Sequence, residues 1–241
     1  MIRTEIIHFL KYTHIYNGLY SCSHLNLTHN PIKIKNQIVM AENLLIIFVK
    51  NPVVGEVKTR LAASIGDMNA LQVYKSLLSH TRNVASEAEA DRQVWYSSKI
   101  DRRDAWESSL FEKKLQSGSN LGERMGNAFS RGFEQGYKQI VIIGSDCAEL
   151  TSDHIEEAFH LLESHDAVIG PSEDGGYYLL GLTRFHPEIF RDVAWSTSSV
   201  LARTIEKFEE NQISYKELET LNDIDNEEDF KKSDLTLPYV D

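Results

Sequence analysis

Two positively charged side chains lie close together in a loop that follows the first long apolar run of the 241-residue sequence. The loop reads KNPVVGEVKTRL: it opens with Lys50, contains Gly55, and ends with Lys58, Thr59 and Arg60. An ammonium, a hydroxyl and a guanidinium at this spacing can hold a diphosphate, because arginine donates to two phosphate oxygens at once. The loop is not a P-loop, since the opening glycine is missing, and the chain has no G-x-G-x-x-G fingerprint. An ordinary solvated basic turn has the same composition, so both interpretations stay open at this point.

Acidic side chains form a second group of candidates. Asp146 follows the apolar run Gln139–Ile143. A carboxylate at the end of a buried strand can bind Mg²⁺ or Mn²⁺, which prefer carboxylate oxygens. Asp223 and Asp225, near the C-terminus, are candidates for completing this metal site, and we retain Asp225. The alternative for Asp146 is that its side chain caps a turn.

A third candidate lies between two further predicted strands, in the segment GPSEDGGYYLLG. Asp174 in this segment can bind the hydroxyl group of an acceptor and take its proton as the hydroxyl attacks. An acidic hairpin turn is the alternative, and the residue types favour it, because Asp-Gly is a common turn dipeptide. Arg124, in LGERM, is placed either to reach a phosphate or to pair with a neighbouring acid.

These candidates depend on a regular alternation of strands and helices. Apolar or alternating runs predict strands at 44–49, 92–96, 139–143, 167–170, 177–182 and 214–218. Apolar residues at helical spacing predict helices after Asp67, near 101–115, at 121–133, after Thr151, near 198–211 and from Asn226. This alternation indicates an α/β fold with a mostly parallel central sheet and helices on both faces. In such sheets ligands bind beyond the carboxyl ends of the strands, where the charged candidates lie.

Polar residues mark where several of these helices begin. Asp67 is expected to cap the first of them, and residues 151–153 offer a cap for a later one. Asn226 followed by Asp229 is typical of a helix start, which favours capping for Asn226. Residues 195–197 are expected to cap the helix that follows them.

Composition and charge exclude several classes of protein. The chain has 25 basic and 36 acidic residues and a net charge of −11, which argues against a nucleic-acid partner or an anionic membrane surface. Its apolar runs are too short to span a bilayer. Its two cysteines cannot form a disulfide framework or a thiolate zinc site, and we expect Cys147 to have a packing role. We therefore expect a cytoplasmic protein with a small ligand.

The sequence changes character near residue 40. Residues 1–39 are basic, follow neither a strand nor a helix period, and lack the apolar core of a signal peptide. We expect this segment to be a dispensable extension, disordered or non-native, and residues 40–241 to form a single domain.

Six segments, taken in order, resemble one known family. They are FVKNPVVGEVKTRL, NLGERM, IIGSDCAEL, GPSEDGGYYLLGL, WSTSSVLARTIE and LNDIDNEEDF, and they cover about residues 43–230. The family is that of small bacterial GT-A-type glycosyltransferases associated with arsenosugar biosynthesis, long known only as a domain of unknown function. The resemblance implies a nucleotide-diphospho-sugar transferase fold, which is similar to that of small nucleotidyltransferases such as the phospholactate and molybdopterin guanylyltransferases. This chain departs from the family at Ala148, where proline is usual, and Ser145-Asp146-Cys147 is not a full D-x-D pair.

By position, the resemblance implies that Lys58 and Arg60 meet nucleotide phosphates, that Asp146 binds a divalent metal and that Asp174 lies on the acceptor side. Together with the residue patterns above, this gives a full set of candidate roles. Nucleotide or phosphate binding falls to Lys50, Gly55, Lys58, Thr59, Arg60 and Arg124, and metal binding to Asp146 and Asp225. The acceptor side consists of Asp174, Gly175, Gly176 and Tyr177. Lys58 and Asp174 are the implied catalytic residues.

The leading expectation is an enzyme that moves a sugar from a nucleoside-diphosphate sugar to a small hydroxyl acceptor, assisted by Mg²⁺ or Mn²⁺. Lys58, Arg60 and a metal at Asp146 would stabilise the charge that grows on the leaving diphosphate. The first alternative is a nucleotidyltransferase, similar to a guanylyltransferase, that uses a nucleoside triphosphate and releases pyrophosphate. A non-catalytic nucleotide-sugar-binding protein is a further alternative.

Overall fold

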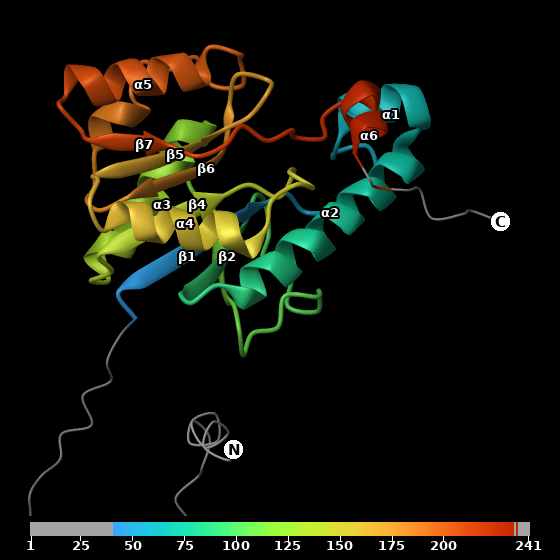
Figure 1. The fold of residues 1–241 in the computed structure, drawn as a ribbon. Helices are drawn as coiled ribbons and strands as arrows, with labels where there is room; N and C mark the ends of the chain where they lie inside the picture. Colours follow the sequence, from blue (N-terminus) through green and yellow to red (C-terminus); the bar gives the residue numbers. More distant parts are fainter. Residues whose placement is uncertain (1–40, 234, 236–241) are drawn as a thin grey trace, which may run out of the picture. The chain divides into compact units, whose positions relative to one another are not determined.

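The computed structural model describes residues 41–233 and 235 of the chain. These residues form an α/β domain around a seven-stranded sheet with the strand order β3-β2-β1-β4-β6-β5-β7 (Figure 1). The strands are β1 (Asn43–Val49), β2 (Asp91–Tyr96), β3 (Glu112–Leu115), β4 (Gln139–Ile143), β5 (Ala167–Pro171), β6 (Tyr177–Leu182) and β7 (Tyr215–Glu217). The helices are α1 (Thr59–Ile65), α2 (Asp67–Glu87), α3 (Leu121–Glu134), α4 (Ser152–Leu162), α5 (Val200–Glu210), α6 (Glu227–Lys232) and the 3₁₀ helix η1 (Pro187–Phe190). The predicted extension, residues 1–39, lies outside the described residues.

Most strands of the sheet run in the same direction. β1 pairs in parallel with β2 and β4, β3 pairs in parallel with β2, and β7 pairs in parallel with β5. Among the described strands only β6 is antiparallel to its neighbours, β4 and β5, because the short turn after β5 sends the chain straight back. The carboxyl ends of the parallel strands and the β5–β6 turn therefore meet at one edge, and the predicted mostly parallel sheet is confirmed.

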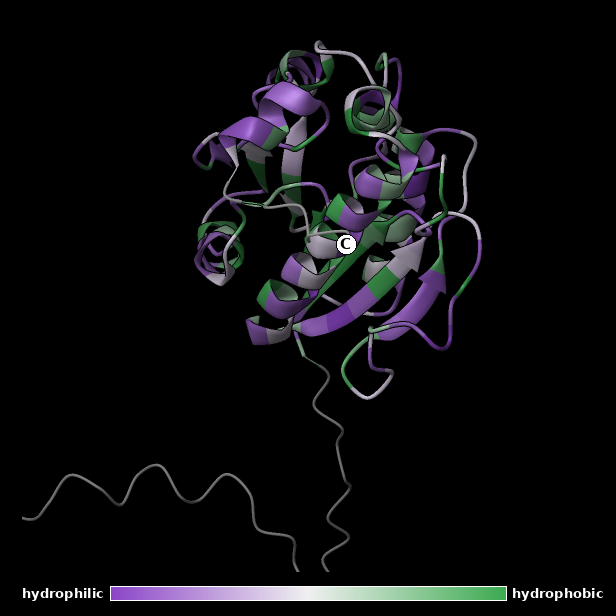
Figure 2. Ribbon diagram, turned by 90° about the vertical axis from the view of Figure 1, so that its right-hand side faces the viewer, coloured by the Kyte–Doolittle hydropathy of each residue, from purple (hydrophilic) through white to green (hydrophobic). Residues whose placement is uncertain are grey.

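Helices cover both faces of the sheet, which explains the continuous apolar runs in the central strands. Leu45 and Ile47 of β1 belong to a buried cluster with residues of α2 and α4. Leu44 and Ile46, which point to the other face, belong to a cluster with residues of α3 and α5. Figure 2 shows hydrophobic residues in the central strands and hydrophilic residues on the outer sides of the helices. The predicted arrangement of helices on both faces is thus confirmed.

The predicted charged helix at 101–115 is wrong. This segment is an irregular loop that leads into the edge strand β3. Asp104 accepts hydrogen bonds from the backbone N–H of Trp106, at 3.1 Å, and from the Tyr96 hydroxyl, at 2.6 Å. Such local side-chain bonds compete with a helical ladder. Trp106 and Phe111 are both buried and meet edge to face, with ring centroids 5.0 Å apart, although their spacing would place them on different sides of a helix.

The predicted helix caps are confirmed for α6 and α4 and are wrong for α2. Asn226 caps α6, where its side chain accepts two backbone N–H groups, and Thr151 caps α4 in a reciprocal capping box. The prediction that Asp67 caps α2 is wrong. Gly66, with a φ of 84°, takes the cap position because glycine adopts this left-handed backbone without strain. Asp67 lies in the first turn of α2 instead, where a carboxylate stabilises the helix dipole.

Candidate functional site

A cavity of about 840 Å³ opens at the carboxyl edge of the sheet, beside the β1–α1 loop, the end of β4 and the β5–β6 turn. The predicted site residues that line it are Lys50, Lys58, Thr59, Arg60, Arg124, Asp146, Asp174, Gly176, Tyr177 and Asp225. Gly55 and Gly175 do not line the cavity themselves, but each belongs to a loop whose other residues do. Both have a positive φ, 77° for Gly55 and 86° for Gly175. The volume is in the range of small-molecule binding sites.

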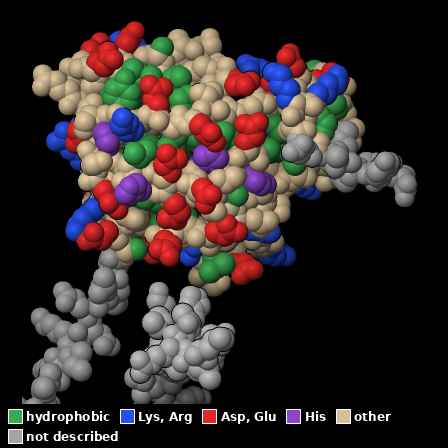
Figure 3. Space-filling model, viewed as in Figure 1, with side chains coloured by type: hydrophobic (Ala, Val, Ile, Leu, Met, Phe, Trp, Pro, Cys, Tyr) green, Lys and Arg blue, Asp and Glu red, His purple; other side chains and the backbone are tan. Residues whose placement is uncertain are grey.

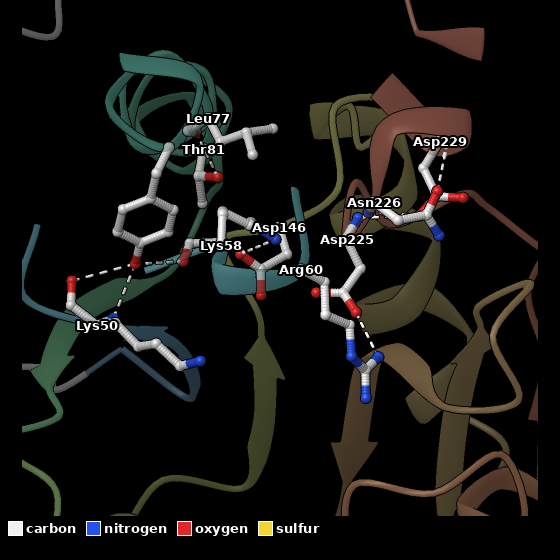
Figure 4. A network of polar contacts seen from close by, with 11 residues as sticks. Lys50, Lys58, Arg60, Leu77, Thr81, Asp146, Asp225, Asn226 and Asp229 are labelled. Atoms are coloured by element: carbon white, nitrogen blue, oxygen red, sulfur yellow. Dashed lines mark hydrogen bonds and ion pairs between the residues drawn. The ribbon is translucent and has the colours of Figure 1, made fainter. Parts of the chain in front are cut away.

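Lys58 and Asp146 form an ion pair that lines this cavity (Figure 4). Lys58 Nζ lies 2.8 Å from Asp146 Oδ1, and 5% of the lysine side chain is exposed, against 43% of the aspartate side chain. The two residues meet because β1 and β4 are adjacent parallel strands, with Ile47 opposite Ile143, so that the loops after them begin side by side. Lys58 has a left-handed backbone, with φ 49° and ψ 43°, a strained conformation that is often found at functional sites.

Arg60 forms a second ion pair, with Asp225. Arg60 Nη1 lies 2.6 Å from Asp225 Oδ2, and the side chains are 75% and 40% exposed (Figure 4). Ile224, beside Asp225, is fully buried in a cluster with Leu61 and Leu77, which holds the segment before α6 against α1 and α2. The carboxylate of Asp225 is therefore paired with a guanidinium, and its predicted metal role stays a prediction.

Asp223, which we set aside in favour of Asp225, lies next to Asp146. Asp223 and Cys147 form an antiparallel β-bridge, and the backbone N–H of Ile224 donates to the Asp146 carbonyl at 3.0 Å. Within the described residues, Asp223 Oδ1 is buried and has no hydrogen-bond partner. Burial and the nearby negative charge of Asp146 raise the pKa of Asp223 to about 7. No local sequence signal separates Asp223 from Asp225, because only the bridge to Cys147 determines which of them is buried.

The pair Asp146 and Asp223 is a donor set that fits a divalent cation. A buried carboxylate oxygen without a partner, beside a second carboxylate, provides the hard oxygen ligands that Mg²⁺ and Mn²⁺ prefer. Across residues 41–233, no group of three or more His, Cys, Asp or Glu side chains is arranged to hold a metal. A cation here would therefore need further ligands from a substrate or from water. Cys147 is buried beside this pair, and burial raises the pKa of its thiol to about 12, which agrees with the expected packing role.

Asp174 takes part in the β5–β6 turn, and its predicted role toward an acceptor stays a prediction. Asp174 Oδ1 accepts hydrogen bonds from the Ser172 hydroxyl, at 2.7 Å, and from the Gly176 N–H, at 2.8 Å, so the predicted turn is present. Gly175 in this turn packs so closely that a Cβ would lie 2.2 Å from the Ser198 carbonyl oxygen. The same turn places Asp174 and Gly176 at the wall of the cavity.

Arg124 lines the cavity from the first turn of α3. Its Nε donates to the Gly118 carbonyl at 3.2 Å, and its Nη1 donates to Gln116 Oε1 at 3.4 Å. Both acceptors are uncharged, and within the described part of the chain Arg124 forms no ion pair with a carboxylate. Neither contact is the pairing with a neighbouring acid, and the phosphate role of Arg124 stays a prediction.

Residues 195–197 form another part of the wall and do not cap α5 as predicted. The helix begins at Val200, and its cap residue Ser199 makes no side-chain capping bond. The Thr197 hydroxyl instead donates within its own turn, to the Ala194 carbonyl at 2.7 Å. The Trp195 ring lies against α3, where a Cβ on Gly122 would come within 2.2 Å of the indole nitrogen.

The outer surface around α4 carries mainly acidic side chains, with histidines between them (Figure 3). This agrees with the net charge of −11, and this face offers no basic patch for a polyanion. The cations Lys58 and Arg124 lie in the cavity instead. In the part of the chain that the structure describes, no helix has the length and apolar character needed to cross a membrane.

Comparison with known proteins finds one family that matches part of the sequence and several solved structures with a similar fold. Residues 80–197 match a family described as "Uncharacterized protein conserved in bacteria (DUF2064)". No curated protein matches the sequence. The fold is similar to that of a Mycobacterium sp. strain JC1 homologue of Mycobacterium tuberculosis Rv0371c, with a TM-score of 0.51 and 14% identity over 80% of this chain and 96% of that one. It is also similar to a 4-diphosphocytidyl-2C-methyl-D-erythritol synthase, with a TM-score of 0.50 and 12% identity over 80% of this chain and 97% of that one.

A stronger similarity exists to a protein from Desulfovibrio desulfuricans G20 that is named provisionally as a nucleotide-diphospho-sugar transferase. The two chains are 30% identical and superpose with a TM-score of 0.72, over 78% of this chain and 84% of that one. The chain therefore belongs to the nucleotide-diphospho-sugar transferase-like family of the Desulfovibrio protein.

Proposed function

We propose that the protein is a glycosyltransferase that moves a sugar from a nucleoside-diphosphate sugar to a small hydroxyl acceptor. The observation that carries this proposal is the Lys58–Asp146 ion pair, which lines one cavity together with Asp223 at the carboxyl edge of the sheet. Membership of the same family as the Desulfovibrio protein supports it, because that protein carries the name of a nucleotide-diphospho-sugar transferase.

The cations of the β1–α1 loop bind the diphosphate in this proposal. The Lys58 ammonium leaves Asp146 and takes a phosphate oxygen as its partner, so that it stays paired while it is buried. Arg60 does the same from the rim, where its side chain is 75% exposed and its pair with Asp225 is open to solvent. Lys50, Thr59 and Arg124 line the same cavity and supply further donors to the nucleotide.

Asp146 and Asp223 would hold a divalent cation. Once Lys58 has moved to the phosphate, both carboxylates lack a positive partner, which makes a cation at this place favourable. When bound there, Mg²⁺ or Mn²⁺ supplies positive charge to the oxygens of the leaving diphosphate.

Asp174 acts on the acceptor. Its Oδ1 is used by the β5–β6 turn, which fixes the carboxylate in place and leaves Oδ2 to receive a proton. The acceptor oxygen forms a bond to the anomeric carbon as the bond from that carbon to the diphosphate oxygen breaks. The acceptor proton goes to Asp174, and the nucleoside diphosphate leaves with the electron pair. Gly175, Gly176 and Tyr177 shape the acceptor side.

The test is to incubate the protein with Mn²⁺ or Mg²⁺, a panel of hydroxyl acceptors, and either nucleoside-diphosphate sugars or nucleoside triphosphates. Release of a nucleoside diphosphate that depends on the acceptor supports the proposal. Release of pyrophosphate from a triphosphate would establish nucleotidyl transfer in its place. Metal-dependent binding of donors without any turnover would point to a binding protein.

Asp174→Asn tests the catalytic role of Asp174. Asparagine keeps an oxygen for the bonds from Ser172 and Gly176, so the turn is retained. We expect transfer to fall by a factor of about 100, with donor affinity unchanged, because the variant loses only the proton acceptor. Unchanged transfer would remove Asp174 from the mechanism.

A further inference from the structure

Tyr74 of α2 joins the two loops that provide Lys58 and Asp146. Its side chain is 1% exposed, and its hydroxyl lies within hydrogen-bond distance of Lys50 and Ser145. Lys50 is the first residue of the loop after β1, and Ser145 directly precedes Asp146. Figure 4 shows Lys50 within this network, near the ion pair of Lys58 and Asp146.

The hydroxyl of Tyr74 makes three polar contacts. The Lys50 N–H donates to Tyr74 Oη at 2.8 Å, and the Tyr74 hydroxyl donates its single hydrogen to the Lys50 carbonyl at 3.1 Å. In this arrangement the contact with Ser145 Oγ, at 3.2 Å, has Ser145 as its donor, although either oxygen can donate in this pair. A phenolic oxygen gives one hydrogen bond and accepts two, so the capacity of Tyr74 is saturated. Burial raises the pKa of Tyr74 above its ordinary value, which keeps this hydrogen in place.

These bonds act where the sheet itself no longer connects the two strands. The parallel pairing of β1 and β4 ends at Ile47 and Ile143, before Lys50 and Ser145 are reached. Within the described residues, the Tyr74 hydroxyl contacts both segments beyond that point. On the side of Asp146 away from α2, the backbone N–H of Ile224 donates a hydrogen bond to the Asp146 carbonyl. Asp146 is thus fixed between α2 and the segment that carries Asp223.

We infer that Tyr74 is a positioning residue of the donor site, whose hydroxyl sets the separation between the Lys58 loop and Asp146 for a diphosphate to bridge. This inference rests on the proposed function, because it concerns the distance between the Lys58 loop and Asp146, which both bind the sugar donor in that proposal. Tyr74 lines the cavity but acts through Lys50 and Ser145, and it takes no part in the chemistry.

The test compares two tyrosine-to-phenylalanine variants. Tyr74→Phe keeps the ring and removes the hydroxyl that joins the loops. Tyr137→Phe is the matched control: Tyr137 is also buried, and its hydroxyl donates to Asp91 at 2.8 Å, at the first residue of β2 and so at the opposite end of the sheet. Both variants lose one hydroxyl, so their melting temperatures report the purely structural effect.

The probes are inorganic pyrophosphate and a panel of nucleoside diphosphates. Each probe is titrated into the protein in the presence of Mn²⁺, and its affinity is measured by calorimetry. We expect Tyr74→Phe to weaken the binding of both probes by about tenfold, as for loss of one buried hydrogen-bonded link, and Tyr137→Phe to change it less than twofold. The affinity for the bare nucleoside should change little in either variant, which a general loosening of the fold would not predict.

Ser145→Ala keeps the inference falsifiable if Tyr74→Phe does not fold. It removes the bond from Ser145 to Tyr74 and leaves both bonds to Lys50, so we expect a loss of about threefold in pyrophosphate affinity. In the double variant the two losses should not add, because both act through one hydroxyl.

Three outcomes overturn the inference. If wild-type protein binds no diphosphate probe, the proposed function fails and the inference fails with it. If wild-type protein binds the probes and Tyr74→Phe binds them as well as Tyr137→Phe does, the inference fails alone. If Tyr74→Phe does not fold, unchanged affinity in Ser145→Ala overturns the inference.

Discussion

Two ion pairs share the short segment 58–60 and differ in exposure, in the place of their acidic partner and in backbone conformation. Lys58 and Arg60 are separated by one residue, yet their side chains are 5% and 75% exposed. Lys58 pairs with Asp146, at the end of a central strand, whereas Arg60 pairs with Asp225, just before a short terminal helix. Lys58 also has a strained left-handed backbone, whereas Arg60 lies in the first turn of α1.

The difference indicates which pair controls binding. A buried charge that loses its partner is strongly destabilised, so in the proposed function Lys58 would leave Asp146 only when an anion replaces it. An exposed pair is screened by salt and contributes little, so in the proposed function Arg60 would exchange Asp225 for a phosphate at almost no cost. Donor binding should therefore depend mainly on the buried pair and be adjusted by the exposed one.

The largest effect on donor affinity is expected from neutralising Asp146, with neutralisation of Asp225 as the comparison. Asp146→Asn should lower the Mn²⁺-dependent affinity for a nucleoside diphosphate by about 100-fold, because it removes the carboxylate that is proposed to hold the metal and leaves the buried Lys58 ammonium without its partner. Asp225→Asn should lower it by no more than about twofold. Isothermal titration calorimetry of both variants checks this. Equal losses in the two variants would erase the distinction between the pairs.

The next effect concerns Lys58 as a competitor of the metal. The Lys58 ammonium neutralises Asp146 when no donor is present, so Lys58→Met should raise the affinity for Mn²⁺ alone by about tenfold. The same variant should weaken pyrophosphate binding by about 30-fold, because a phosphate ligand is lost. Electron paramagnetic resonance titration of free Mn²⁺ measures the first change and calorimetry the second. Mn²⁺ affinity that does not rise would contradict the competition.

A smaller effect is expected at the exposed cation. Arg60→Ala should weaken diphosphate binding by about threefold at low ionic strength, since its charge acts from the rim through solvent. The loss should disappear in high salt, whereas that of Lys58→Met should persist. Calorimetry at two salt concentrations tests this. A loss in Arg60→Ala that salt leaves unchanged would place Arg60 deeper in the site than its exposure indicates.

The smallest effect is on stability. Removing the exposed pair through Asp225→Asn should change the free energy of unfolding by less than about 0.5 kcal/mol, because surface ion pairs contribute little. Urea unfolding followed by circular dichroism gives this value, with wild-type protein as the reference. A change of 2 kcal/mol or more would show that the Arg60–Asp225 pair has a structural role.

The sequence predicts much of this arrangement because its main signals are local. The apolar runs of β1 and β4 are continuous since both faces of the sheet are covered, and each is followed directly by a charged segment. Parallel strands bring those segments to one edge, so Lys58 and Asp146 could be expected in the same region. Asn226 could likewise be recognised as a helix cap from its immediate neighbours.

What the sequence does not show depends on contacts between distant residues. Asp223 and Asp225 are equivalent in the local pattern, and the bridge from Asp223 to Cys147 decides which is buried. Tyr74 occupies an apolar position of a helix, and spacing cannot tell whether its hydroxyl only packs or joins two loops. The helix predicted near 101–115 fails because Asp104 bonds to Trp106 locally.

The central claim is that Lys58 exchanges Asp146 for a phosphate when the donor binds. A crystal structure with Mn²⁺ and a nucleoside diphosphate tests it most directly, since anomalous scattering locates the metal. The account predicts the metal between Asp146 and Asp223, with Lys58 Nζ against a phosphate oxygen. A diphosphate bound in the cavity while Lys58 still pairs with Asp146, and no anomalous peak beside Asp223, would contradict it.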